Sequence, residues 1–107
     1  MMDMQRVYLG TELKLNVNIE SLGELRMDNY DFVVELSCTP KNSVLITKAN
    51  AKRVDEKNYI VCVDTRKLGV GKLTCTVKAS IPDDDFDDGF RTEIAVVNTN
   101  IHIVKVG

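Results

Sequence analysis

The sequence predicts an all-β protein, an antiparallel two-sheet sandwich of immunoglobulin-like architecture with about 6–8 strands. Apolar and polar residues alternate over most of the 107 residues, which is typical of half-buried strands. Turn-forming residues separate these alternating runs at intervals that suit short connections. The one helical candidate, residues 48–57, has too few apolar residues at helical spacing. We expect one domain over residues 1–107, and an open barrel is the alternative arrangement.

Alternation defines the strands in order. The clearest runs span residues 12–20, 31–38 and 72–81, with shorter candidates at residues 6–9 and 43–47. Residues 59–63 are apolar on both faces, which predicts a central or doubly covered strand. The last run, residues 90–106, changes its apolar parity near residues 98–100, which predicts a bulge or break. The predicted core contains Leu15, Val17, Phe32, Val34, Leu36, Val61, Val63, Leu73, Cys75, Val77 and Ile94.

Three connections are predicted from turn chemistry. Residues 55–58 form a hairpin turn, because Asp and Asn adopt left-handed backbone and bond to their own backbone. Residues 65–71 form a compact connection with one helical turn that Gly69 closes. Residues 22–28 form a loop.

Residues 80–93 contain five aspartates, Pro82, Phe86 and Gly89 between two strand-like runs. We expect an ordered connector, because clustered carboxylates repel and need an anchor. The anchors are Phe86, packed inward, and Arg91, which meets one or more of Asp83, Asp85 and Asp88. The exposed part of this loop is a candidate docking edge for a neighbouring subunit, formed by Asp83, Asp85, Phe86, Asp88 and Arg91.

A calcium site at Asp83, Asp85 and Asp87 is the alternative for this loop, because calcium prefers carboxylate oxygens. The EF-hand pattern fails, since Asp88 stands where glycine is needed and Ile94 where a bidentate glutamate is needed. The expectation is therefore that the chain holds no metal and no other cofactor.

Composition argues against several classes of function. The net charge of -2 and scattered basic residues argue against nucleic-acid binding. No apolar run reaches the roughly 20 residues of a membrane helix, and the N-terminus lacks the apolar part of a secretory signal. No phosphate loop or hydrolase motif is present, so we expect neither an enzyme nor a small-molecule substrate. Cys38, Cys62 and Cys75 are expected to be reduced core residues, and His102 a surface or edge residue.

Several short motifs follow one another along the chain. They are Tyr8-x-Gly10-Thr11, Asp31-Phe32, Asp64-Thr65-x-x-Leu68-Gly69-x-Gly71 and Ile81-Pro82-Asp83-x-Asp85-Phe86. In these motifs the chain resembles small immunoglobulin-like proteins from prophage-like regions of gut bacteria. It is more loosely similar to the N-terminal domain of siphophage upper baseplate proteins. Asp87 departs from the pattern, which has proline before Asp-Gly.

The resemblance implies a structural module of a phage tail or baseplate that packs against copies of itself or against neighbouring proteins. The missing secretory signal predicts a location in the bacterial cytoplasm, and the resemblance adds the virion after assembly. The alternative function is a surface sandwich that binds carbohydrate or protein and uses calcium through residues 83–88.

Overall fold

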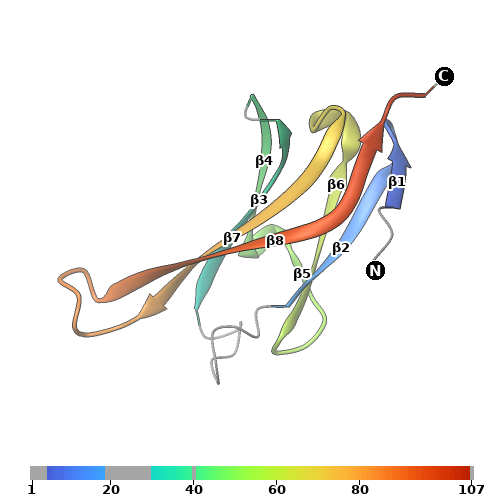
Figure 1. Ribbon diagram of the computed structural model, residues 1–107. Coiled ribbons are helices and arrows are strands. Elements are labelled where there is room, and N and C mark those ends of the chain that lie inside the picture. The colour runs from blue at the N-terminus through green and yellow to red at the C-terminus, as the bar shows by residue number, and fades with distance from the viewer. Residues whose placement is uncertain (1–4, 19–29, 40, 107) are drawn as a thin grey trace.

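The computed structural model describes residues 5–18, 30–39 and 41–106, and they form two sheets with a core between them (Figure 1). The predicted loop at residues 22–28 lies outside the described residues. Two 3-10 turns, η3 (Lys48–Asn50) and η4 (Thr65–Lys67), lie between strands. The strands are β1 (Gln5–Tyr8), β2 (Glu12–Asn18), β3 (Asp31–Thr39), β4 (Asn42–Thr47), β5 (Lys52–Arg53), β6 (Asn58–Asp64), β7 (Gly71–Pro82) and β8 (Phe90–Val104).

The strand order confirms a two-sheet, sandwich-like protein and excludes the open barrel. One sheet has the order β1-β8-β7-β3-β4 and the other β2-β6-β5. The expectation that every pair is antiparallel is wrong at one place, because β1 runs parallel to β8 with Gln5 opposite Ile101. A tight hairpin forces its two strands to be antiparallel, but β1 and β8 are joined only through the rest of the domain. No helix among the described residues could cross a membrane.

The core is built from the inward positions of both sheets. Nine of the eleven predicted core residues are buried: Val17, Phe32, Val34, Leu36, Val61, Val63, Leu73, Cys75 and Val77. Leu15 is half-buried and packs against them. Aromatic rings join the sheets, because Phe32 on β3 meets Tyr59 on β6 edge to face at a centroid distance of 5.1 Å.

Two chain crossings between the sheets meet at one side chain, that of Thr65. The chain leaves β1 for β2 at Gly10 and Thr11, and leaves β6 for β7 through η4. The Thr65 hydroxyl donates to the Thr11 carbonyl at 2.8 Å and accepts from the Gly10 N–H at 2.8 Å. Thr65 is fully buried, at 0% exposed. This hydroxyl therefore fixes both crossings relative to each other.

The predicted compact connection after β6 is confirmed. The Asp64 carboxylate accepts the Arg66 N–H at 3.0 Å, which caps η4. Leu68 then enters the core, and Gly69 turns the chain at a φ of 79°. At Gly71, with a φ of 135°, a β-carbon would lie 3.2 Å from the Cys38 carbonyl oxygen, so this close approach needs glycine.

Two further local predictions are confirmed. Residues 55–58 form the hairpin turn between β5 and β6, and the Asp55 carboxylate accepts the Lys57 N–H at 2.8 Å. In β8 the ladder with β7 shifts register between the pairs Thr74–Asn98 and Lys72–His102. Asn100 adopts a φ of 57° there. The bulge explains why the apolar parity of the last run changes.

The Thr65 hydroxyl gives the first prediction. Thr65→Val keeps the shape of the side chain but leaves the Gly10 N–H without its acceptor. The free energy of unfolding should therefore fall by about 1–2 kcal/mol. Thr65→Ser retains the hydroxyl, so its free energy of unfolding should fall clearly less than that of Thr65→Val. Urea unfolding of the three proteins measures the difference, and equal stability of wild type and Thr65→Val would contradict the role assigned to the hydroxyl.

Candidate functional site

The β7–β8 hairpin extends away from the two-sheet body and carries the acidic loop at its tip (Figure 1). The molecule measures 53 Å along its long axis and 28 and 27 Å across it. We call the distal hairpin, residues 76–96, the arm, and residues 83–89 within it the acidic turn. β3 pairs with β7 only as far as Ser80, so the end of the arm is a two-stranded ribbon.

The acidic turn is an ordered connector, as predicted. The Asp83 N–H donates to the Gly89 carbonyl at 2.8 Å, and the Gly89 N–H donates to the Phe86 carbonyl at 2.9 Å. Two carboxylates hold the backbone as well. Asp83 accepts the Asp85 N–H at 3.0 Å, and Asp88 accepts the Phe90 N–H at 3.1 Å. Backbone hydrogen bonds therefore hold this turn.

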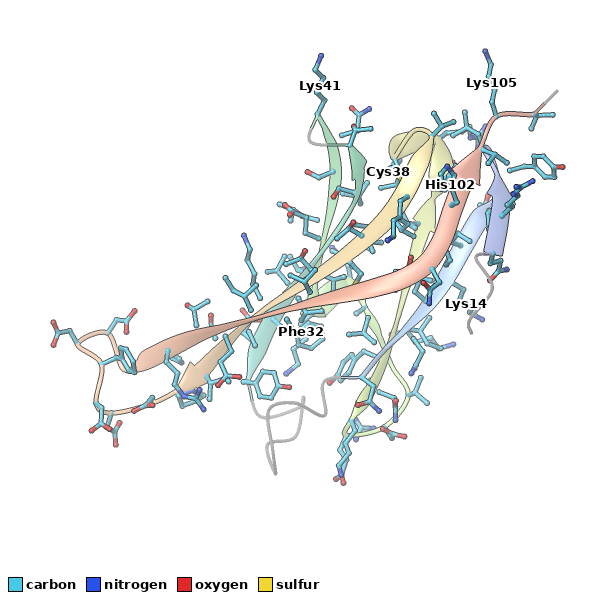
Figure 2. The ribbon with its side chains drawn as sticks, in the orientation of Figure 1. Lys14, Phe32, Cys38, Lys41, His102 and Lys105 are labelled. Carbon is cyan, nitrogen blue, oxygen red and sulfur yellow. The ribbon has the colours of Figure 1, made fainter. Side chains whose placement is uncertain are left out.

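Arg91 meets the acidic turn at Asp83, where Nε lies 3.2 Å from the carboxylate, and it also pairs with Glu93. Both partners of Arg91 are partly exposed, so each pair contributes little to stability in water. Figure 2 shows Lys41 and Lys105 at the other end of the molecule from the acidic turn. The acidic turn is therefore far from these two lysines.

The prediction that Phe86 packs inward is wrong. Its side chain is 51% exposed. The turn lies at the tip of the two-stranded ribbon, beyond Ile81, which is the last buried core residue of β7. The ring contributes apolar surface at the tip and does not anchor the turn.

The structure does not bring Asp83, Asp85 and Asp87 together as a calcium site. Within the described residues, no group of three or more His, Cys, Asp or Glu side chains is placed to hold a metal ion. Asp83 already uses its carboxylate for the Asp85 N–H and for Arg91. The calcium alternative for this loop therefore lacks the geometry that it needs among the described residues.

An exposed apolar stripe on β8 is the feature that sequence reasoning missed. Phe90, Ile94 and Val96 are 50%, 62% and 69% exposed and lie on the outer face of the five-stranded sheet. Placing Ile94 in the core was wrong, because it pairs with Lys78, whose side chain faces water. The pairing of Pro82 with Phe90 fixes which residues of β7 and β8 lie opposite each other. The length of the turn between the two strands is therefore the sequence signal that would have shown these apolar residues to face outward.

Tyr30, which directly precedes β3, is a buried residue of the body whose ionisation the arm influences. This side chain is buried, and within the part of the chain that the structure describes its hydroxyl has no hydrogen-bond partner. Burial, together with the nearby charges of Glu93 and Tyr59, raises the pKa of Tyr30 to about 12. Glu93 on the arm therefore lies close enough to the body to influence ionisation there.

The three cysteines differ, which corrects the expectation that all are core residues. Cys75 is buried and Cys38 is half-buried, and burial raises the pKa of both thiols. Cys62 is exposed, because β6 is central in its sheet, as predicted, but only its inner face is covered. His102 is half-buried and lies opposite Lys72 on β7.

Comparison with family models, with curated proteins and with solved structures found no match to the chain.

The exposed position of Phe86 gives the second prediction. Phe86→Ala should change the free energy of unfolding by no more than about 0.5 kcal/mol, as expected for a surface substitution. Phe32→Ala is the matched control, because Phe32 is 1% exposed and its loss should cost about 3–5 kcal/mol. Thermal unfolding compares them, and a large fall in Tm for Phe86→Ala would show that the ring packs inward after all.

Thiol accessibility gives the third prediction. In the native protein Cys62 should react first with an aromatic disulfide reagent, Cys38 more slowly, and Cys75 only after unfolding. Cys62→Ser should remove the fast phase and leave the others unchanged. The rates are followed by absorbance, and fast reaction of Cys75 without denaturant would contradict the assignment.

Proposed function

We propose that the chain is a non-enzymatic, immunoglobulin-like assembly module of a phage tail or baseplate and contacts neighbouring proteins through its arm. The observation that carries the proposal is the arm itself, a projecting hairpin whose outer face bears exposed Phe90, Ile94 and Val96. Exposed apolar residues that cluster on one surface are typical of protein–protein contact sites. The resemblance of the short motifs to prophage-encoded proteins supports the phage context.

The strand order supports the immunoglobulin-like part of the proposal. In immunoglobulin sandwiches strands B, E and D share one sheet, strands C, F and G the other, and variable types add C′ beside C. The orders β2-β6-β5 and β8-β7-β3-β4 correspond to B-E-D and G-F-C-C′. In this correspondence the arm is the hairpin of strands F and G, whose connecting loop is a contact loop in variable domains.

The geometry of the arm suits a role in assembly. Its tip lies at one end of the 53 Å axis, and the pairing of β7 with β3 holds its base. Of the candidate docking residues, Asp85, Phe86 and Asp88 are exposed, whereas Asp83 and Arg91 are partly buried and pair with each other. The outward carboxylates and the apolar stripe together offer a partner a surface with both charge and hydrophobic area.

The experiment tests whether the chain enters particles. Particles are induced in the bacterium that encodes the chain, purified on a density gradient and examined by mass spectrometry. Peptides of the chain should be found in the particle fraction. The double variant Ile94→Lys with Val96→Lys should fold normally, as judged by circular dichroism, and be lost from the particles.

Leu45→Lys is the matched control, because Leu45 is equally exposed at 63% on the same outer face but lies on β4, at the opposite edge of the sheet from the open edge of β8. It should enter particles like the wild type. Absence of the wild-type chain from purified particles, although it is present in the cell extract, would overturn the phage proposal. Normal incorporation of the double arm variant would overturn the role of the arm.

A further inference from the structure

The arm leaves one edge of β8 open. β1 pairs with β8 only from Ile101 to Val104, and among the described residues no other strand pairs on that side. Within the described residues, β8 is therefore bonded to β7 alone over residues 90–98. An open edge of this length presents backbone donors and acceptors to any strand that can lie beside it.

The hydrogen bonding of the turn shows which residues present those groups. In an antiparallel ladder, residues that bond to the partner alternate with residues whose N–H and C=O point away. The Asp83 N–H bonds to the Gly89 carbonyl, so Arg91, Glu93 and Ala95 face β7 with their backbone groups. Thr92, Ile94 and Val96 direct theirs to the open edge.

Two observations agree with this assignment of inward and outward backbone groups. The Phe90 N–H is directed away from β7 and is taken by the Asp88 carboxylate at 3.1 Å. Pro82, which has no N–H to donate, lies opposite Phe90, where the ladder needs no donor. Asp88 therefore marks the outer limit of the open edge.

We propose that this edge pairs antiparallel with the same edge of a second copy of the chain, about a two-fold axis through Thr92. The proposal rests on the assembly role above and names the partner that the arm contacts first. Two-fold pairing of identical strands is self-complementary, and it joins the two five-stranded sheets into one. It also places the exposed stripes of both copies side by side on the outer face.

Charge selects the register. With Thr92 on the axis, Arg91 lies opposite Glu93 of the second copy, and Phe90 lies opposite its Ile94. Opposite charges and aromatic–β-branched pairs directly across two strands are stabilising. Arg91 and Glu93 are 33% and 34% exposed in their side chains, so each can reach a partner.

The neighbouring registers are less favourable. With Glu93 on the axis, the two copies of Glu93 face each other, and like charges directly opposite are destabilising. With Ile94 on the axis, Glu93 lies opposite Ala95 and the charges have no partner across the strands. The Thr92 register pairs the two strands over residues 90–94, because β8 begins at Phe90, so the incoming strand ends before Ile101, where β1 occupies the edge.

The test measures mass in solution by light scattering after size-exclusion chromatography, over a wide concentration range. The wild type should approach twice the monomer mass. Glu93→Lys and Arg91→Glu each place like charges opposite at both symmetric positions, so each variant alone should be monomeric. Thr92→Pro removes the outward N–H on the axis without touching the ladder to β7, and it should also be monomeric. Leu45→Lys should remain dimeric.

An equimolar mixture of Glu93→Lys and Arg91→Glu gives the sharpest outcome. Arg91 of the first variant then faces Glu93 of the second, and the two introduced side chains face each other with opposite charge. Folded monomers that form a dimer only on mixing support the register. A monomeric wild type, a dimer that survives either charge variant, or folded variants that stay monomeric on mixing would overturn the proposal. Presence of the chain in particles is measured separately, so a monomer would not decide the assembly role.

Discussion

The Thr65 hydroxyl holds the two sheets in relation to each other, and the rest of the architecture depends on it. It bonds to Gly10 and Thr11, where the chain leaves the five-stranded sheet, and it belongs to the turn through which the chain returns there. A buried hydroxyl contributes to folding only when its bonds are made, so a wrong pairing of the crossings would leave it unsatisfied. Hydrophobic burial drives the sheets together, and this one polar contact selects how the chain passes between them.

The arm combines weak support with a defined conformation. No residue of the acidic turn is buried, yet backbone hydrogen bonds and the carboxylates of Asp83 and Asp88 fix its conformation. Natural proteins commonly protect open strand edges with charge. Here the five aspartates at the tip repel a second acidic tip, and Asp88 occupies the Phe90 N–H. Pairing along the edge is thereby limited to the middle of the strand, which favours a closed pair over an open-ended stack of strands.

Local patterns predicted the elements well, because each depends on residues close together in the chain. Alternation found the long strands, and Asp55 and Gly69 marked their turns. The bulge near Asn100 was predicted from the change of parity and is confirmed. These features need no knowledge of which strands become neighbours.

The errors all concern facts that depend on distant partners. Ile94 and Phe86 were placed inside because apolar residues are usually buried. Ile94 faces outward because it pairs with Lys78, and Phe86 is exposed because it lies at the tip of a hairpin that extends beyond β3. Cys62 is exposed because β6 has only one covered face. The parallel pairing of β1 with β8 likewise joins two segments that lie far apart in the sequence. The acidic turn was found from composition, whereas the apolar stripe beside it required the register.

The bulge in β8 makes the length of the arm independent of how the body is packed. On one side of residues 98–100 the strand is fixed by β1 and the core, and on the other it only continues the ladder with β7. Each residue adds about 3.4 Å along a strand, and faces are preserved only when residues are added in twos. Insertion of two residues in each strand near the tip would therefore lengthen the arm by about 7 Å. The core would be untouched, so related chains can differ in span by such steps while the fold stays constant.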